Sequence, residues 1–288
     1  MSPNFIHAFC PFSPLVSTST IISPDTIIPT MFTQGVRVLT FDLDNTLWHT
    51  VPVILAANKA LHAHLASLHP EISKLFPPEK WRDLQNKIME DNPSDRHDLT
   101  AIRKRALEYT ARVAYPNLDA AAITGISDDA FAAFIKKRND TKGHLFPEVI
   151  ETLQTLKGRG YVLGSLTNGN ADVFSMPHLE DLFSFSVSAI SAGAAKPDRR
   201  PFHKAFGFAR LHGQAREPSQ VFHVGDSIYS DVVPAKLYGF QTCWVRTGDD
   251  RTSASPTEAD VVVQSFVELR DMFPGPFGDG DGKPKGLL

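Results

Sequence analysis

Short apolar runs alternate with amphipathic stretches along most of this 288-residue chain. Runs rich in β-branched and aromatic residues predict buried strands, and helical spacing of apolar residues between those runs predicts helices. Alternation of this kind favours an α/β fold, in which a parallel sheet carries helices on both faces. The predicted strands cover 36–41, 161–167, 185–190, 221–224, 241–245 and 261–263, and later helices lie near 202–211, 231–237 and 266–272, with a helical stretch from the turn after Thr167 to about Phe183.

Between the first and second strands the pattern stays helical for about 90 residues. Amphipathic stripes recur between positions 51 and 142, and turns that contain proline separate them near 77–78, 91–93 and 116–119. We therefore expect an all-helical insert over 51–142. The sheet-forming core then comprises 35–50 and 143–273, with a helix start at Pro147.

The two ends of the chain differ in composition from the rest. Residues 1–34 are rich in Ser, Thr and Pro and contain no Lys or Arg, and a Pro/Gly/Lys segment follows Phe273. We expect a mobile N-terminal extension over 1–34 and a disordered tail over 274–288. Targeting signals usually carry basic residues, but the shortage of acids in 1–34 leaves an organelle transit peptide open as an alternative.

Charge and composition narrow the classes of partner. A net charge of -3 provides no general attraction to nucleic acid or to anionic membranes. The longest apolar run, 51–57, is too short to span a bilayer, and only Cys10 and Cys243 are available for disulfides. We expect a soluble, cytoplasmic protein, a monomer or a homodimer, with neither nucleic acid nor membrane as a partner.

Polar side chains gather where the predicted strands end. Because the carboxyl ends of parallel strands meet at one edge of a sheet, where ligands bind, these side chains should converge. Taken singly, such residues are often helix caps or turns, but their joint order argues against coincidence. The set comprises Asp42, Asp44 and Thr46 after the first strand, Thr167, Asn168 and Gly169 after the second, Lys196 before the fourth, and Asp226 and Asp231 after it.

This set of groups suits phosphoryl transfer. A phosphate monoester carries almost two negative charges, so an attacking carboxylate needs cations beside it. We expect Mg²⁺ as the cofactor, held by the Asp42 carboxylate, the backbone carbonyl of Asp44 and Asp226. Lys196 supplies a second positive charge, which at about 4 Å and an effective dielectric of about 20 contributes roughly 4 kcal/mol.

The two acids of the first motif can divide the labour. Asp42 is the predicted nucleophile, which forms an aspartyl phosphate. Asp44 is the predicted acid that protonates the leaving alkoxide, and later the base that activates water. Thr46 is expected to hydrogen-bond Asp44 or the backbone, and Asp231 is also expected to orient the site.

The phosphate group itself needs hydrogen-bond donors. We expect the Thr167 hydroxyl and the backbone N–H groups of Asn168 and Gly169 to bind the phosphoryl oxygens, together with Lys196. A glycine at position 169 lets the backbone approach the ligand closely.

These motifs resemble those of a known family. The segments Asp42–Thr46, Thr167–Gly169, Lys196–Pro197 and Gly225–Asp226, with Asp231, look like the four motifs of the haloacid dehalogenase superfamily. The resemblance covers about 36–273 and implies a Rossmann-like core with a helical cap inserted after the first motif, magnesium dependence and an aspartyl-phosphate intermediate. Dehalogenase members lack the second acid, so Asp44 indicates phosphatase chemistry.

A narrower resemblance concerns the substrate. Segments 51–54, 167–171, 223–226 and 243–246 are similar to phosphatases of this superfamily that act on flavin mononucleotide (FMN) and 5-amino-6-(5-phospho-D-ribitylamino)uracil in riboflavin biosynthesis. The similarity is looser through the cap, which usually selects the substrate. We expect a small phosphorylated metabolite, preferably one of these two esters. The alternatives are a sugar-phosphate or nucleotide phosphatase with the same core and, more remotely, a catalytically silent binding protein.

Overall fold

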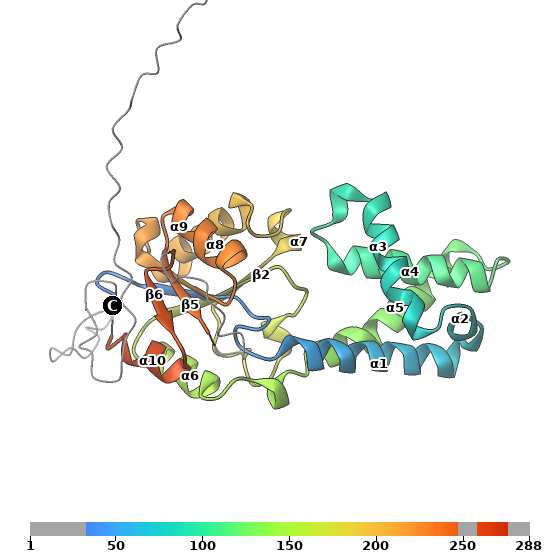
Figure 1. The fold of residues 1–288 in the computed structure, drawn as a ribbon, viewed down its shortest axis with the longest axis horizontal. Helices are drawn as coiled ribbons and strands as arrows, with labels where there is room; N and C mark the ends of the chain where they lie inside the picture. The colour runs from blue at the N-terminus through green and yellow to red at the C-terminus, as the bar shows by residue number, and fades with distance from the viewer. Residues whose placement is uncertain (1–32, 247–257, 276–288) are drawn as a thin grey trace, which may run out of the picture.

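The computed structural model describes residues 33–246 and 258–275 (Figure 1). Most of the predicted extension over 1–34 and tail over 274–288 therefore lies outside the described residues, as does Cys10. Among the helices within these limits, none is both long enough and apolar enough to cross a membrane.

A six-stranded parallel sheet forms the centre of the core, in the order β3-β2-β1-β4-β5-β6. The α/β class predicted from the apolar runs is thus confirmed. β1 lies between β2 and β4, with Phe41 in register with Ser165 on one side and Val224 on the other. The strands are β1 (Val38–Phe41), β2 (Val162–Thr167), β3 (Phe185–Ser188), β4 (Val221–Gly225), β5 (Gln241–Val245) and β6 (Val261–Val263).

Helices cover both faces of the sheet (Figure 1). Successive side chains of a strand point to opposite faces, so Leu39 and Phe41 pack with the helices on one face and Val38 with those on the other. The first face carries α6 (Val149–Gly158) and α10 (Phe266–Asp271), and the second carries α8 (Arg199–Gly213) and α9 (Val233–Tyr238). Both faces are therefore buried, as the near-continuous apolar strands require.

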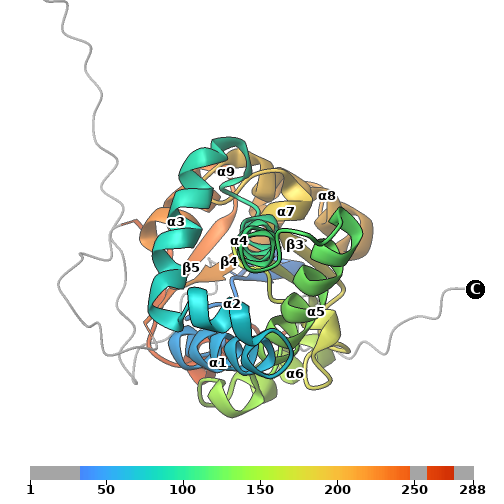
Figure 2. The ribbon, with the colours of Figure 1, turned by 90° about the vertical axis from the view of Figure 1, so that its right-hand side faces the viewer.

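The segment after β1 forms a separate helical bundle beside the sheet (Figures 1 and 2). Its apolar stripes meet in a core of their own that includes Leu61, Leu65, Leu107 and Phe134. The bundle comprises α1 (Thr50–Leu68), α2 (Pro70–Leu75), α3 (Trp81–Asp91), α4 (Leu99–Ala114) and α5 (Ala120–Arg138), with short 3₁₀ turns at Pro78–Lys80 and Pro93–Asp95. We keep 51–142 as the proposed bounds of this cap, and 35–50 with 143–273 as those of the core.

The entry and exit of the cap lie side by side. Trp48, just before α1, forms an isolated antiparallel bridge with Leu145, which follows the 3₁₀ turn Lys142–His144. The His49 N–H donates to the carbonyl of His144 at 2.9 Å, and the Phe146 N–H donates to that of Leu47 at 3.0 Å. The two connections between cap and core are therefore joined to each other.

Some predicted elements are wrong in extent. The strand predicted to reach Ile190 ends at Ser188, because Ser188 and Ser191 form a capping box that starts the short helix α7 (Ala189–Ala192). The helix predicted from the turn after Thr167 to Phe183 is only a 3₁₀ turn at Val173–Ser175, followed by turns around Pro177, which has no N–H to donate.

Smaller differences concern element starts. α6 begins at Val149 rather than Pro147, because Glu148 adopts a left-handed conformation with φ 59°. The helix predicted over 231–237 consists of a π-helical turn at Ile228–Val232 followed by α9, and a 3₁₀ turn at Pro218–Gln220 precedes β4. The predicted strand β5 and edge strand β6 have the predicted bounds.

Candidate active site

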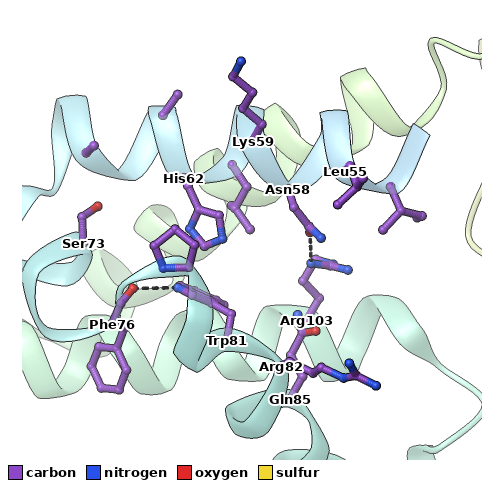
Figure 3. Close-up of a pocket in the computed structure, with 15 residues that line it drawn as sticks. Leu55, Asn58, Lys59, His62, Ser73, Phe76, Trp81, Arg82, Gln85 and Arg103 are labelled. Atoms are coloured by element: carbon purple, nitrogen blue, oxygen red, sulfur yellow. Dashed lines mark hydrogen bonds between the residues drawn. The ribbon is translucent and has the colours of Figure 1, made fainter. Parts of the chain in front are cut away.

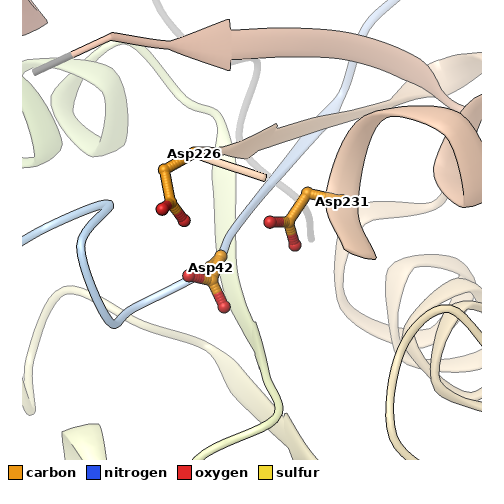
Figure 4. Close-up of side chains that lie close together, drawn as sticks. All are labelled: Asp42, Asp226 and Asp231. Carbon is orange, nitrogen blue, oxygen red and sulfur yellow. The ribbon is translucent and has the colours of Figure 1, made fainter. Parts of the chain in front are cut away.

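The polar residues that follow the strands converge at the carboxyl edge of the sheet. Asp42 follows β1, Thr167 ends β2 and Asp226 follows β4, and these are three adjacent strands. Asp231 comes from the π-helical turn after β4. Figure 4 shows the side chains of Asp42, Asp226 and Asp231 close together, and one oxygen from each lies within 4.8 Å of the others.

Lys196 provides the buried positive charge of this cluster. Its side chain is 1% exposed, and Nζ donates to Asp42 Oδ1 at 2.8 Å, to Asp231 Oδ1 at 2.5 Å and to the carbonyl of Leu166 at 2.6 Å. All three ammonium hydrogens thus have an acceptor. Burial acts to lower the pKa of Lys196, but the charges of Asp231 and Asp42 together raise it above its ordinary value.

Both carboxylate oxygens of Asp231 have hydrogen-bond partners among the neighbouring residues. Oδ1 accepts from Lys196 and lies 3.2 Å from His223 Nε2, while Oδ2 accepts from the Ser227 N–H at 3.2 Å. Burial acts to raise the pKa of Asp231, but the Lys196 charge and the His223 hydrogen bond lower it well below its usual range. A Cβ at position 225 would lie 2.4 Å from Asp231 Cγ, so only glycine fits there.

Asp42 and Asp226 hold protons more tightly than ordinary carboxyls. Burial raises the pKa of Asp42 to about 7 against the opposing charge of Lys196. Burial, and then the charge of Asp231, raises the pKa of Asp226 to about 6. A cation placed between the two carboxylates would relieve this cost, because it stabilises both charged forms.

Thr46 links these two acids. Its hydroxyl lies 3.1 Å from Asp42 Oδ2 and 3.2 Å from Asp226 Oδ1, and it accepts from the Asp226 N–H at 3.1 Å. The expected hydrogen bond to Asp44 is wrong, whereas the alternative of a backbone partner is correct. Asn45, in a left-handed conformation with φ 59°, turns the chain so that Asp42 and Thr46 face the same side.

The donor set fits a hard divalent cation. All candidate ligands are carboxylate oxygens, which Mg²⁺ prefers. Asp231 belongs to the geometric cluster, but its side chain is 1% exposed, against 10% for Asp42, and its Oδ1 faces both Lys196 and His223. Asp42 and Asp226 are therefore the better side-chain ligands. The Asp44 side chain points elsewhere, so the predicted part of Asp44 in metal binding rests on its backbone carbonyl alone.

Asp44 turns toward the cap. Its Oδ1 accepts from Trp48 Nε1 at 3.0 Å and from the Thr50 hydroxyl at 3.0 Å, and its Oδ2 pairs with Nη2 of Arg138, the last residue of α5. The Arg138 side chain is 1% exposed, whereas that of Asp44 is 23% exposed. The two acids of the first motif therefore have separate surroundings, since Asp42 faces the buried cluster and Asp44 faces the cap boundary.

The predicted phosphate-binding loop lies next to Asp44 and to the backbone of Lys196. The Gly169 N–H donates to Thr167 Oγ1 at 2.9 Å, and the side chain of Asn168 exchanges two hydrogen bonds with the backbone of Lys196, at 2.9 and 2.7 Å. A Cβ at Gly169 would lie 2.6 Å from Asp44 Oδ2 and 3.1 Å from Arg138 Nη2. The missing side chain thus keeps space open beside Asp44.

Two residues of this site escaped the analysis of the sequence. Arg138 lies far from every motif along the chain, and three basic residues in a row at the end of a helix usually indicate a solvated last turn. His223 sits inside a buried strand, where its partners Thr40 and Asp231 come from other segments. The signal available for His223 is its place two residues before the fourth motif, Gly225–Asp226, whereas Arg138 has none.

Comparison with known proteins agrees with this geometry. Residues 36–239 match the family model of haloacid dehalogenase-like hydrolases. The chain is 30% identical over 218 residues to the 5-amino-6-(5-phospho-D-ribitylamino)uracil phosphatase YigB of Escherichia coli, which spans 73% of this chain and 84% of that protein. It is 28% identical over 242 residues to a phosphoglycolate phosphatase of Haemophilus influenzae, covering 81% of this chain and 96% of that protein.

Solved structures share the fold. A 2-haloacid dehalogenase from Pseudomonas syringae pv. Tomato superimposes with a TM-score of 0.72 at 31% identity, over 82% of this chain and 97% of that one. A haloacid dehalogenase-type phosphatase from Thermococcus onnurineus superimposes with a TM-score of 0.55 at 22% identity, over 83% of this chain and 98% of that one, and supports the fold alone. The chain belongs to the haloacid dehalogenase-like hydrolases and is a phosphatase of that family.

Proposed function

We propose that this phosphatase hydrolyses a small phosphate monoester whose leaving group carries a flat ring, preferably FMN or 5-amino-6-(5-phospho-D-ribitylamino)uracil. The observation that carries the reaction is the separation of the two acids: Asp42 bonds Lys196 in the buried cluster, and Asp44 bonds Arg138 at the cap boundary. One carboxylate is thus placed for attack and the other for proton transfer.

Asp42 is the proposed nucleophile. Oδ1 lies 2.8 Å from Lys196 Nζ, and the Thr46 hydroxyl restrains Oδ2, so the carboxylate is held in one orientation. Asp231 holds Lys196 in turn and is the proposed orienting residue. An oriented carboxylate attacks phosphorus without first having to search for its geometry, and it forms an aspartyl phosphate.

Asp44 is the proposed acid and base. Trp48 and Thr50 fix one oxygen, and Arg138 contacts the other, on the side next to Gly169. From this position Asp44 can protonate the ester oxygen as it leaves and then deprotonate the water that hydrolyses the acyl phosphate. Its partners keep it at the boundary where the leaving group departs.

Two sets of groups balance the negative charge of the phosphoryl group. Lys196 and the loop of Thr167, Asn168 and Gly169 supply positive charge and N–H or O–H donors. Mg²⁺, when bound through Asp42 and Asp226, would neutralise charge on the ester and polarise its phosphorus. Desolvated donors of this kind are worth more than the same groups in water.

Two observations support the substrate class: the names of the relatives, and the resemblance of segments 51–54, 167–171, 223–226 and 243–246 to phosphatases that act on these esters. YigB is named for 5-amino-6-(5-phospho-D-ribitylamino)uracil and matches 73% of this chain. Other relatives are named for phosphoglycolate and for glyceraldehyde 3-phosphate, and these keep the alternative of a small sugar-phosphate or nucleotide substrate.

A panel of substrates tests the proposal. We expect phosphate release from FMN with Mg²⁺, loss of that release with EDTA, and a kcat/KM at least tenfold above that for phosphoglycolate or glycerol phosphate, a discrimination of about 1.4 kcal/mol. A 2-haloacid serves as the control for dehalogenase chemistry, and no halide release is expected. Equal kcat/KM for FMN and the simple esters would remove the ring-bearing substrate while leaving the phosphatase assignment in place.

A further inference from the structure

The cap carries a groove that none of the proposed catalytic residues lines. It has a volume of about 820 Å³, within the range of small-molecule sites, and lies between α1, α2, α3 and α4 (Figure 3). Figure 3 shows His62 and Asn58 reaching from α1 toward Trp81 and Arg103 on the opposite wall. The groove is open on one side, where the Leu55 side chain is 63% exposed.

The charges along the groove have one sign. Its charged residues are Lys59, Arg82 and Arg103, and no carboxylate lines it within the part of the chain that the structure describes. The remaining wall is mostly apolar or aromatic, with Phe76 and Trp81 prominent. Such a surface suits a flat ring whose edge carries hydrogen-bond acceptors or negative charge.

Arg103 holds a positive charge in a fixed position on the wall of the groove. Its guanidinium lies 3.7 Å from the centroid of the Phe134 ring and donates from Nη1 to Asn58 Oδ1 at 3.1 Å. Its Nε is buried and has no hydrogen-bond partner among the described residues. Burial, and then the charge of Arg138, lowers the pKa of Arg103 to about 10, so the group stays cationic at neutral pH. The Nε nitrogen is shielded from the groove as well, so Arg103 acts on a ligand there through its positive charge rather than through the Nε hydrogen.

Two helices, α1 and α4, each lead from a residue that contacts the reaction centre or its loop to a residue that lines the groove. On α1, Leu55 is five residues, about 7.5 Å, beyond Thr50, whose hydroxyl donates to Asp44. On α4, Arg103 is three residues, about 4.5 Å, beyond Thr100, whose hydroxyl accepts from Asn170 Nδ2 at 3.3 Å, directly after the predicted phosphate loop.

We propose that this groove is the subsite for the leaving group, and that it takes a flat, acceptor-rich heteroaromatic ring joined to the phosphate through a short polar chain. The inference rests on the proposed function, because the phosphate is placed at Asp42. Arg103 and Arg82 then act as residues that determine specificity. The apolar wall with Trp81 and Phe76 covers a face of the ring.

The test compares two matched charge reversals on α3. Arg82 lies in the groove and Lys87 does not, and both are exposed. For each protein, kcat/KM is measured for FMN and for ribitol 5-phosphate, which has the same polyol chain and no ring. We expect Arg82→Glu to lower the ratio of kcat/KM for FMN to kcat/KM for ribitol 5-phosphate about tenfold or more. Lys87→Glu should keep this ratio within about twofold of wild type. Leu55→Glu, at the exposed core-side end, should lower it as Arg82→Glu does.

Riboflavin has the ring but no phosphate, so its binding tests the proposed subsite separately from the proposed substrate. We expect the wild-type protein to quench riboflavin fluorescence and Arg82→Glu to weaken that binding by a similar factor. An unchanged ratio in both groove variants, or riboflavin binding that they do not alter, would overturn the subsite and leave the phosphatase intact. Groove-dependent riboflavin binding without a preference for FMN would overturn the proposed substrate and leave the subsite standing.

Discussion

The core and the cap fix their side chains in different ways. In the core, Lys196 and Asp231 are each 1% exposed, and every hydrogen of the Lys196 ammonium has a partner. The cap reaches the site through hydrogen bonds at its edge, among them Arg138 to Asp44 and Asn170 to Thr100. The core network is closed on all sides, whereas at the edge of the cap the Arg138 side chain is buried but its partner Asp44 is 23% exposed. We therefore propose that the reaction resides in the core and the choice of leaving group in the cap.

The largest effect should follow from changing the core nucleophile. Asp42→Asn keeps the volume of the side chain but removes the attacking carboxylate, so we expect turnover to fall by about 10⁴-fold or more. The measurement is phosphate release from a generic ester with Mg²⁺, with circular dichroism as the check on folding. A folded variant that retained a tenth of wild-type activity would end the covalent mechanism.

The next effect concerns the buried ion pair. Asp231→Asn leaves Lys196 with one charged partner instead of two, and breaking a buried pair on one side costs about 3–5 kcal/mol of the free energy of unfolding. Denaturant unfolding measures this loss. The control is Asp198→Asn in the exposed pair with Arg200, which should unfold like the wild type. Equal free energies of unfolding for the two variants would show that the buried Lys196–Asp231 pair contributes no more to stability than the exposed Arg200–Asp198 pair.

A smaller effect is expected where the cap touches Asp44. Arg138→Met keeps an apolar stem but removes the contact with Oδ2, so Asp44 loses one of its restraints. We expect kcat for alkyl phosphates to fall about 10- to 100-fold, and kcat for p-nitrophenyl phosphate to fall less, because that leaving group needs little protonation. Lys136→Met, an exposed cation two residues earlier in α5, is the matched control. Equal losses on both esters would indicate a purely structural role for Arg138.

A last effect, of similar size, concerns how metal binding by Asp42 and Asp226 depends on pH. The pKa of Asp42 is raised to about 7 and that of Asp226 to about 6, so protons compete with Mg²⁺ for both carboxylates as the pH falls. Mg²⁺ affinity should therefore be about 10- to 100-fold weaker at pH 5.5 than at pH 7.5, with protons released on binding. Calorimetry in buffers of different ionisation enthalpy measures both quantities. An affinity independent of pH would exclude these two carboxylates as the ligands.

The sequence predicted the core better than the cap. The apolar runs of β1, β4 and β5 are long enough to identify, and the polar residues after them converge because parallel strands share one carboxyl edge. The partners of Asp44 depend instead on how the cap docks. Arg138 is 94 residues away in sequence, and no local pattern encodes that distance. For Thr46 the sequence predicts a bond to Asp44 or to the backbone, and the turn at Asn45 directs its hydroxyl to the carboxylates of Asp42 and Asp226 and to the Asp226 N–H.

The groove shows the same limit. The periodicity of α1 and α3 separates buried from exposed positions, but it does not reveal that Leu55 and Arg82 border a shared hollow. Trp81 lies on the wall of that hollow, 5% exposed, with its indole N–H bonded to the carbonyl of Phe76 at 2.8 Å. Which polar residues line a cavity depends on packing between helices, which sequence spacing alone does not fix.

The bridge between Trp48 and Leu145 makes the helical bundle an interchangeable unit. Since the chain leaves the sheet layer and returns to it at adjacent backbone positions, the bundle can be cut out without displacing either β1 or α6. Grafting the corresponding bundle of a relative between these two residues should change the preference among esters, provided that the graft keeps Thr50 and Arg138, which contact Asp44.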